Sequence, residues 1–240
     1  MGIKRSELSI ERLLRPSEYK QSDAIIKERL TGRPLWYIIG DTEFCGCKIK
    51  VDERVLIPRP ETEILAEFAI KTVEENDKVL DMCTGSGCIA IAIAHACRGK
   101  NVSVTAADVS DAAIMLAREN ANYNSANITF VQSDLFHNIH GRYNLIVCNP
   151  PYVKSSEIPS LQKEVREFEP KVALDGGDDG LEFYRRLAKD VSRYLAKDGM
   201  IILECGEGQV TEILKLFDKR EYAMIMKDLA GVERFLKIAY

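Results

Sequence analysis

The tetrapeptide Asn149-Pro150-Pro151-Tyr152 directly follows an apolar run, YNLIVC, that is typical of a buried strand. Two successive prolines remove two backbone donors and fix φ, so a sheet cannot continue through them. The loop that results is stiff, and it carries a side-chain amide, a backbone carbonyl at Pro150 and an aromatic ring. Such a loop can hold a planar group against preorganised hydrogen-bond acceptors.

Methyl transfer from a sulfonium to an amide or aryl amine nitrogen needs an arrangement of this kind. The lone pair of that nitrogen is delocalised, so two acceptors must bind its N–H protons and aim the lone pair at the methyl carbon. We predict that Asn149 Oδ1 and the Pro150 carbonyl are these acceptors, with Tyr152 stacked on the planar group. The surplus proton leaves afterwards, so no strong general base is required. The alternative is an Asn-Pro turn without chemistry.

A second stretch, DMCTGSGCIA, places Gly85-x-Gly87-x-x-Ala90 after a strand and at the start of a helix, which predicts a nucleotide site. Asp108 ends the next predicted strand, where its carboxylate can accept hydrogen bonds from a ribose diol. Ligands of open α/β sheets bind at the carboxyl ends of the strands, so Asn149 should face the same crevice. The glycine loop alone fits NAD or S-adenosylmethionine, or a tight turn without ligand, and the Asn149 loop favours S-adenosylmethionine.

Strand and helix patterns alternate from residue 60 to the C-terminus. We expect strands at 78–82, 102–108, 128–132, 143–148, 200–205, 222–229 and 234–240, and helices at 60–70, 88–97, 111–124, 181–195 and 208–217. Right-handed parallel connections give a three-layer α/β sandwich. No helix separates the last two strands, so the final one should insert antiparallel. Ahead of these elements, 42–51 is typical of a hairpin and 23–30 of a short amphipathic helix.

The composition suits one large α/β domain or one domain with a small appendage: 240 residues, 46% hydrophobic and 29% charged. The net charge of -4 gives no overall positive field, so we expect no stable nucleic-acid partner. Seven cysteines without paired Cys-x-x-Cys units indicate reduced thiols rather than a zinc site. No run has the length of a signal peptide or a membrane span, so we expect no membrane association and a cytoplasmic protein.

The acidic run DGGDDG, residues 175–180, is a candidate calcium loop on composition only. Counting twelve residues from Asp175 reaches Arg186, where a bidentate glutamate is required. The three histidines have no neighbouring ligands at metal spacing. We therefore expect no metal.

The chain resembles the HemK/PrmC family, the release-factor-specific glutamine-N5 methyltransferases. Eight ordered motifs between Gly32 and the C-terminus carry the resemblance: GRPLWYIIGDTEFCG, VLIPRPETE, DMCTGSGCIAIAIA, SDLF, NPPY, EPKVALDGGDDGLEFYRRL, LECGEGQ and GVERFL. The resemblance implies a Rossmann-like, seven-stranded S-adenosylmethionine-dependent methyltransferase fold. It also implies a role in translation termination, with a substrate glutamine in the Gly-Gly-Gln loop of peptide chain release factors and S-adenosylhomocysteine as the cofactor product.

The same resemblance implies roles for individual residues. Cofactor contacts are implied at Cys83, Thr84, Gly85, Ser86, Gly87, Asp108, Asp134, Leu135 and Asn149. The substrate glutamine is implied to lie against Asn149, Pro150, Pro151 and Tyr152, with Asn149, Pro150 and Tyr152 catalytic. The family also carries the IPRPETE motif beside the site, so Arg59 and Glu61 either shape the pocket or only begin the following helix.

The chain departs from the family pattern at its N-terminus, where only residues 1–31 precede the GRPL motif. The family usually has a complete helical domain there, so the usual mode of release-factor docking is in doubt. We divide the chain into a short helical segment, 1–31, and a methyltransferase domain with an N-terminal hairpin, 32–240.

Three other functions remain as alternatives. An adenine-N6 DNA methyltransferase would present a flipped adenine to the same tetrapeptide, although the acidic composition weighs against it. A glutamine methyltransferase acting on a ribosomal protein would use the same chemistry. A non-catalytic module would bind the cofactor without turnover.

Overall fold

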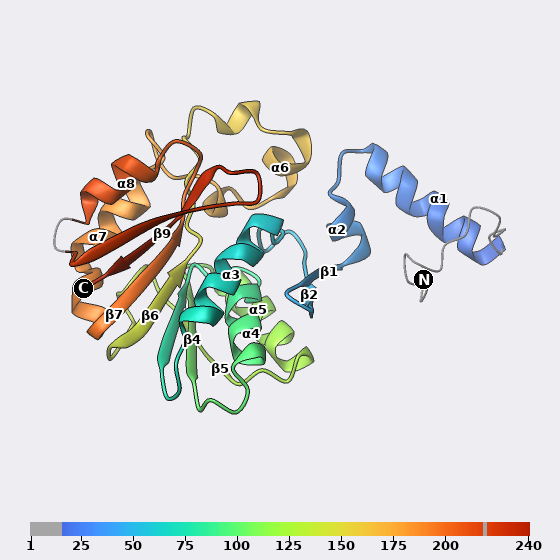
Figure 1. Ribbon diagram of the computed structural model, residues 1–240. Helices are drawn as coiled ribbons and strands as arrows, with labels where there is room; N and C mark the ends of the chain where they lie inside the picture. The colour runs from blue at the N-terminus through green and yellow to red at the C-terminus, as the bar shows by residue number, and fades with distance from the viewer. Residues whose placement is uncertain (1–15, 218–219) are drawn as a thin grey trace.

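The computed structural model describes residues 16–217 and 220–240. Its centre is a seven-stranded sheet in the order β5-β4-β3-β6-β7-β9-β8 (Figure 1). Strand β9 lies antiparallel between β7 and β8, whereas the other pairings are parallel. The strands are β3 (Lys78–Met82), β4 (Ser103–Asp108), β5 (Ile128–Gln132), β6 (Tyr143–Cys148), β7 (Leu195–Glu204), β8 (Tyr222–Lys227) and β9 (Glu233–Ala239).

Helices cover both faces of this sheet, which gives three layers. One apolar core lies between the sheet and α3 (Pro60–Thr72), α4 (Cys88–Ala96) and α5 (Asp111–Tyr123). The core on the opposite face involves α7 (Glu182–Tyr194) and α8 (Val210–Leu216), on the left in Figure 1. Strand β3 is buried over its last four residues, as expected for a parallel strand covered on both faces.

The structure confirms the seven predicted strands, the five predicted helices and the antiparallel insertion of the last strand. It differs at the start of β7, which begins at Leu195 rather than at residue 200. Tyr143 pairs with Leu195 and Leu145 pairs with Met200, so a register shift separates two parts of this strand. Asp198, within the shifted stretch, has a φ of 60°. The polar residues around it interrupt the apolar pattern by which a strand is predicted.

Several short helices lie outside the predicted elements. The excursion from 149 to 179 contains η2 (Ile158–Ser160), α6 (Lys163–Phe168) and η3 (Lys171–Ala173), and α2 (Leu35–Ile39) precedes the hairpin. None of these is longer than six residues, which is too short for a 3.6-residue period to appear.

The structure confirms the predicted hairpin, formed by β1 (Asp41–Phe44) and β2 (Cys47–Lys50). Its two turn residues, Cys45 and Gly46, have φ angles of 47° and 75°. Two consecutive residues with positive φ are typical of the type I′ turn, whose twist matches that of the flanking strands.

The predicted N-terminal helix is longer than expected, because α1 spans Pro16–Leu30. It extends away from the sheet (Figure 1), while its C-terminal end contacts α6. Arg29 forms an ion pair with Glu164 at 2.7 Å, and Lys163 Nζ donates to the Thr31 carbonyl at 2.8 Å. The C-terminal end of α1 is thereby attached to the excursion that follows β6.

All seven cysteines are free thiols. Within 16–217 and 220–240, no cluster of His, Cys, Asp and Glu side chains is arranged to hold a metal ion. Over the same residues, no helix has both the length and the apolar character needed to cross a bilayer.

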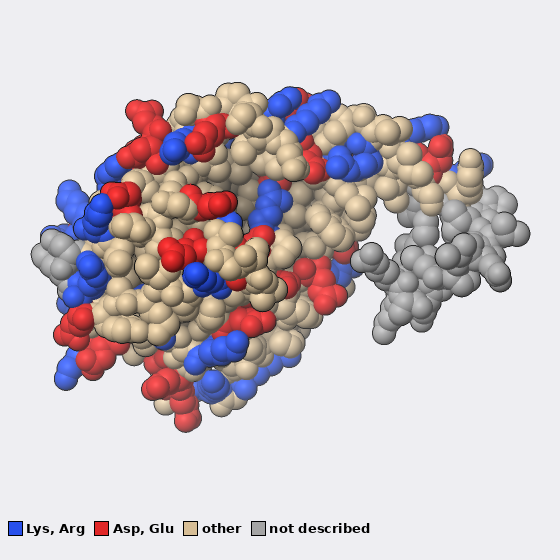
Figure 2. Space-filling model, turned by 45° about the horizontal axis from the view of Figure 1, so that its top comes forward, with Lys and Arg blue, Asp and Glu red and all other residues tan. Residues whose placement is uncertain are grey.

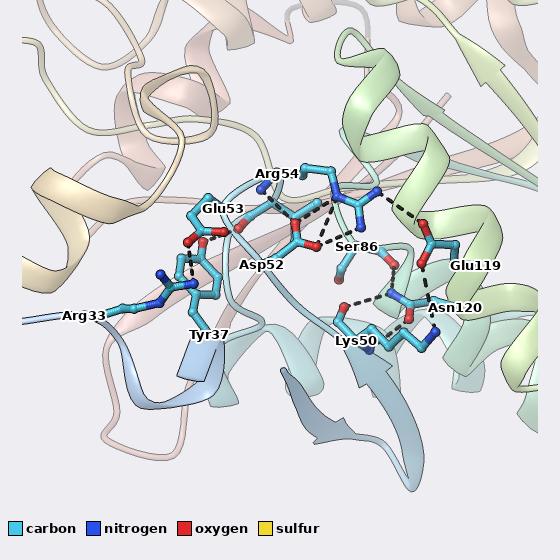
Figure 3. Close-up of polar contacts among 10 residues, drawn as sticks. Arg33, Tyr37, Lys50, Asp52, Glu53, Arg54, Ser86, Glu119 and Asn120 are labelled. Atoms are coloured by element: carbon cyan, nitrogen blue, oxygen red, sulfur yellow. Dashed lines mark hydrogen bonds and ion pairs between the residues drawn. The ribbon is translucent and has the colours of Figure 1, made fainter. Parts of the chain in front are cut away.

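Asn120 of α5 connects the hairpin to the loop between β3 and α4 (Figure 3). Its Nδ2 donates to the carbonyls of Lys50 at 3.0 Å and Ser86 at 2.9 Å, and its Oδ1 accepts from the Lys50 N–H at 2.8 Å. The side chain is fully buried. These backbone groups are therefore satisfied by one side chain that no local pattern would single out.

We expect Asn120→Ala to lower the free energy of unfolding by about 2 to 3 kcal/mol, because it removes three hydrogen bonds and leaves buried backbone groups unpaired. Asn122→Ala is the matched control, since Asn122 is exposed on the same helix. The free energy of unfolding of this control should stay within about 0.7 kcal/mol of the wild-type value, which is the range of helix propensities among ordinary residues. Urea denaturation measures both, and equal losses would contradict this role of Asn120.

Candidate active site

The loop between β3 and α4 folds back on the carboxyl ends of the strands. Thr84 anchors it, because its N–H donates to the Ala107 carbonyl at 2.9 Å and its hydroxyl donates to Asp81 Oδ2 at 2.5 Å. Asp81 Oδ2 also accepts from the Ala90 N–H at 3.1 Å. Burial raises the pKa of Asp81 to about 7 against the opposing effect of these two hydrogen bonds. A buried carboxyl group thus holds both ends of the glycine loop.

The two glycines of this loop serve different purposes. Gly85 and Gly87 have φ angles of 52° and 81°, a region that favours glycine. A Cβ at Gly85 would meet no atom within 4 Å, so this backbone is open to a ligand. A Cβ at Gly87 would lie 3.1 Å from the Ala117 Cβ, so the close approach there is to helix α5.

Asp108 lies at the end of β4, beside the glycine loop. Its Oδ2 accepts from the Gly85 N–H and its Oδ1 from the Ser110 N–H, both at 2.9 Å. Burial raises the pKa of Asp108, and the hydrogen bonds from Ser110 and Gly85 oppose that shift. Each carboxylate oxygen keeps a further lone pair, so the group can accept hydrogen bonds from a diol without leaving its anchors.

A pocket of about 350 Å³ opens at this edge of the sheet. Its volume is in the range of small-molecule sites. Nine of the predicted site residues line it: Cys83, Thr84, Gly85, Ser86, Asp108, Asp134, Leu135, Asn149 and Pro151. Gly87, Pro150 and Tyr152 lie next to the pocket rather than on its wall.

The wall also includes residues for which the sequence predicts no role, among them Thr62 and Arg186. Arg186 Nη2 lies 2.7 Å from both carboxylate oxygens of Asp134. Arg186 comes from α7, and in the sequence it stands out only as the position that does not fit a calcium loop. The ion pair lies at the exposed mouth of the pocket and orients the Asp134 carboxylate.

Arg59 is the N-cap residue of α3 and also forms part of the pocket wall, so the two interpretations of the IPRPETE motif are compatible. Arg59 Nη2 lies 2.6 Å from Glu169 Oε1, and the Glu169 side chain is buried. Burial raises the pKa of Glu169, and the charge of Arg59 opposes that shift. The pair joins α3 to the excursion after β6. Glu61 lies in the first turn of α3, off the pocket wall.

The Asn149 loop is held by hydrogen bonds to three other parts of the chain: α3, the end of β7 and the start of α8 (Val210–Leu216). Asn149 Nδ2 donates to Thr62 Oγ1 of α3 at 3.0 Å, and Thr62 Oγ1 lies 2.9 Å from Glu204 Oε2 at the end of β7. The Tyr152 hydroxyl lies 3.4 Å from the other oxygen, Glu204 Oε1. Gln209 Nε2 donates to the Tyr152 carbonyl at 3.0 Å. Asn149 Oδ1 is consequently the part of the amide that remains for a ligand.

Thr62 and Glu204 belong to this site, although no sequence pattern predicts a role for either residue. Both lie in stretches that carry the family resemblance, IPRPETE and LECGEGQ, but no local pattern distinguishes a structural threonine or glutamate from one that contacts a site. Their burial is the distinguishing signal, with 3% and 1% of the residue surface exposed. Buried polar side chains need partners, and here those partners are the site.

Comparison with known proteins agrees with this geometry. Residues 60–167 match the family model described as methyltransferase small domain. A release factor glutamine methyltransferase from Thermodesulfovibrio yellowstonii is 41% identical over 224 residues, which cover 89% of this chain and 78% of that protein. One from Streptococcus pneumoniae is 42% identical over 226 residues, 92% and 80% of the two chains. The chain belongs to the release factor glutamine methyltransferase family.

Solved structures support the fold of this release factor glutamine methyltransferase family member. A methyltransferase from Pyrococcus furiosus superposes with a TM-score of 0.61 at 18% identity, covering 92% of this chain and 98% of that one. The Mtq2–Trm112 complex of E. cuniculi, described as methylating the eRF1 termination factor, gives 0.54 at 21% identity, covering 78% and 98%. Both likenesses concern the fold alone. The predicted family and the predicted seven-stranded methyltransferase fold are confirmed.

We expect Gly87→Ala to destabilise the fold more than Gly85→Ala does. Both substitutions put a Cβ on a residue with positive φ, which should lower the free energy of unfolding by about 1 to 2 kcal/mol. Only Gly87→Ala adds a close contact with Ala117, which should bring a further loss of about 1 to 3 kcal/mol. Urea denaturation of both variants tests the difference, and equal free energies of unfolding would show that α5 yields at this contact.

Proposed function

We propose that this protein methylates the side-chain amide N5 of the glutamine in the Gly-Gly-Gln motif of peptide chain release factors, with S-adenosylmethionine as methyl donor. The observation that carries the proposal is the orientation of Asn149. Its Nδ2 is engaged by Thr62 on the far side, and its Oδ1 is left as an acceptor in a pocket that also contains the open glycine loop. The names of the relatives at 41% and 42% identity support the same substrate.

The volume of the pocket and the residues that line it fit the proposed cofactor. Gly85 exposes backbone without obstruction, as a nucleoside with an amino-acid tail requires. Asp108 offers carboxylate lone pairs to a ribose diol, and Leu135, buried and adjacent to Asp134, offers an apolar surface to a base. When bound, S-adenosylmethionine supplies an electrophilic methyl group and leaves as S-adenosylhomocysteine.

The residues of the Asn149 loop would orient the nucleophile. Asn149 Oδ1 and the Pro150 carbonyl accept the two N–H bonds of the glutamine amide, which turns its nitrogen lone pair toward the methyl group. The Tyr152 ring packs on the amide plane, and its position is held by Gln209 and Glu204. Methyl transfer gives an amide nitrogen that carries the methyl group, two protons and a positive charge. This cation is strongly acidic, so it releases its surplus proton to water without a strong base and leaves the neutral N-methyl amide.

The alternative substrates fit less well. Lysine and arginine are interspersed with aspartate and glutamate over the face shown in Figure 2, which lacks the continuous basic stripe that a DNA duplex would require. The charge distribution on this face therefore does not support an adenine-N6 DNA methyltransferase. A release factor as substrate also favours a cytoplasmic location.

One assay tests the proposed function against its rivals. The full chain is incubated with S-adenosylmethionine carrying a labelled methyl group and, separately, with a release factor, the same release factor with its Gly-Gly-Gln glutamine changed to alanine, ribosomal proteins, or duplex DNA. We expect label only in the unmodified release factor, on the glutamine, as located by mass spectrometry. Label in DNA or in a ribosomal protein, or cofactor binding without transfer, would each replace the proposal.

We expect Asp108→Asn to weaken S-adenosylmethionine binding by roughly 10- to 100-fold, because charge-assisted hydrogen bonds contribute about 1.5 to 3 kcal/mol. Asp111→Asn is the matched control, since Asp111 is exposed in the first turn of α5. Titration calorimetry measures both affinities. An unchanged Kd in a folded Asp108→Asn protein would remove Asp108 from the cofactor site.

We expect Asn149→Ala to lower kcat by roughly 100- to 1,000-fold, the effect of removing one preorganised polar group at a reacting centre. Cofactor affinity should change much less, because Oδ1 acts on the glutamine. The exposed Asn122→Ala protein serves again as the control. If kcat of Asn149→Ala stays within a few-fold of the wild type, the loop is not catalytic.

A further inference from the structure

Glu204 is a buried carboxyl group whose only role in the proposed mechanism is to help position Tyr152. It is the last residue of β7, and 1% of its surface is exposed. Its two carboxylate oxygens face two different elements: Oε2 faces the Thr62 hydroxyl of α3 at 2.9 Å, and Oε1 faces the Tyr152 hydroxyl at 3.4 Å. A buried carboxylate with two hydroxyl partners directs hydrogen bonds rather than merely packing.

The direction of the hydrogen bonds follows from the chemistry of the groups. An ionised carboxylate only accepts, so the Thr62 hydroxyl must donate its one proton to Glu204. Thr62 Oγ1 then has only lone pairs to offer on its other side. Asn149 must therefore present its NH₂ group to Thr62, as it does at 3.0 Å. Its oxygen is consequently turned away from Thr62.

We propose that Glu204 is a positioning residue that sets, through Thr62, which end of the Asn149 amide faces the substrate. The proposal rests on the proposed function, in which Asn149 Oδ1 accepts a substrate N–H bond. With the amide reversed, Asn149 would present donors to a group that is itself a donor. Binding in the reactive orientation would then be lost, although every side chain of the pocket would remain in place.

A second anchor holds the loop backbone independently of Glu204. Gln209 Nε2 donates to the Tyr152 carbonyl, and Gln209 Oε1 accepts from the Gly206 N–H, both at 3.0 Å. The Tyr184 hydroxyl donates to the backbone carbonyl of Glu204 at 2.7 Å. A change confined to the Glu204 side chain should therefore leave the backbone of the loop and of β7 in position.

Glutamine at this position would reverse the chain of hydrogen bonds. The amide NH₂ of a glutamine can donate to Thr62 Oγ1, and the Thr62 hydroxyl can then donate to Asn149 Oδ1. Asn149 would turn over and direct its NH₂ into the pocket. Glu204→Gln keeps the size and the polar character of the side chain but removes the constraint on direction.

The orientation of the Asn149 amide should also depend on pH. The pKa of Glu204 is raised to about 7. Burial is the main cause and Glu61 adds to it, while the Thr62 hydroxyl, Arg234 and the Tyr152 hydroxyl oppose the shift. Arg234, on β9, is also paired with Asp228 at 2.9 Å. Because the raised pKa favours the neutral form at low pH, the enforced direction is present above about pH 7 and is lost as the pH falls through that value.

The test compares Glu204→Gln with Glu207→Gln, the same substitution at an exposed glutamate of the following turn. We expect Glu204→Gln to lower kcat on the release factor by roughly 100-fold while the calorimetric Kd of S-adenosylmethionine stays within a few-fold. The kcat of the wild type should fall as the pH drops below about 7, and that decline should be absent in Glu204→Gln. Glu207→Gln should behave as the wild type in every measurement.

A measurement without substrate separates this proposal from the proposed function. In protein labelled with ¹⁵N-asparagine, the side-chain protons of Asn149, assigned by their absence in Asn149→Ala, should exchange with solvent more slowly in the wild type than in Glu204→Gln. If the wild type transfers no methyl group to the release factor, the proposed function fails while this comparison still tests the orientation of Asn149.

A second pair of variants tests the same proposal if the Glu204→Gln protein does not fold. Thr62→Val removes the hydroxyl that links Glu204 to Asn149 and should reproduce the loss of kcat and the faster exchange, whereas Thr62→Ser keeps the hydroxyl and should restore both. Two results in a folded Glu204→Gln or Thr62→Val protein would overturn the proposal. One is an exchange rate of the Asn149 side-chain protons equal to that of the wild type, and the other is a kcat within threefold of the wild type.

Discussion

Parallel pairing of the central strands is the constraint on which the whole site depends. Met82 of β3 pairs with Ala107 of β4 and with Cys148 of β6, and Cys148 pairs with Leu203 of β7. The next residue along each strand is therefore at the same edge of the sheet. Those residues are Cys83, Asp108, Asn149 and Glu204, which is the row from which the pocket and its supporting network are built.

Buried polar groups behind that row convert a sheet edge into a defined pocket. Asp81, near the end of β3, holds Thr84 and the start of α4, while Asn120 holds the same loop from the side of α5. Glu204 has the corresponding place behind the Asn149 loop. Each of these groups is shielded from solvent, so water does not compete for its hydrogen bonds. Those hydrogen bonds therefore strongly favour one arrangement of the side chains.

The division of tasks between the two loops follows from this construction. The glycine loop exposes backbone and needs an absence of side chains, which Gly85 provides. In the proposed function, the Asn149 loop needs acceptors in fixed directions, and the two prolines and the contact with Thr62 restrict its conformation. The excursion after β6, attached to α3 through Arg59 and Glu169, adds the rim of the pocket.

By itself, the sequence determined the strands, the main helices, the glycine loop, Asp108 and the Asn149 loop, because each has a signal within a few consecutive residues. Apolar runs, a strand followed by glycines, and paired prolines have local physical causes. Hydrophobic periodicity did not predict α2, α6 or the first residues of β7. These segments are too short or too interrupted to show a pattern.

Only the tertiary structure decided which side chains support the predicted site. Thr62 and Asn149 are 87 positions apart, and Arg186 and Asp134 are 52 positions apart. Nothing in either local segment encodes such a contact, because it depends on which helix packs over which strand end. The orientation of the Asn149 amide belongs to the same class. It follows from the proton direction in a buried chain of three side chains, and that chain exists only once α3, β6 and β7 have come together.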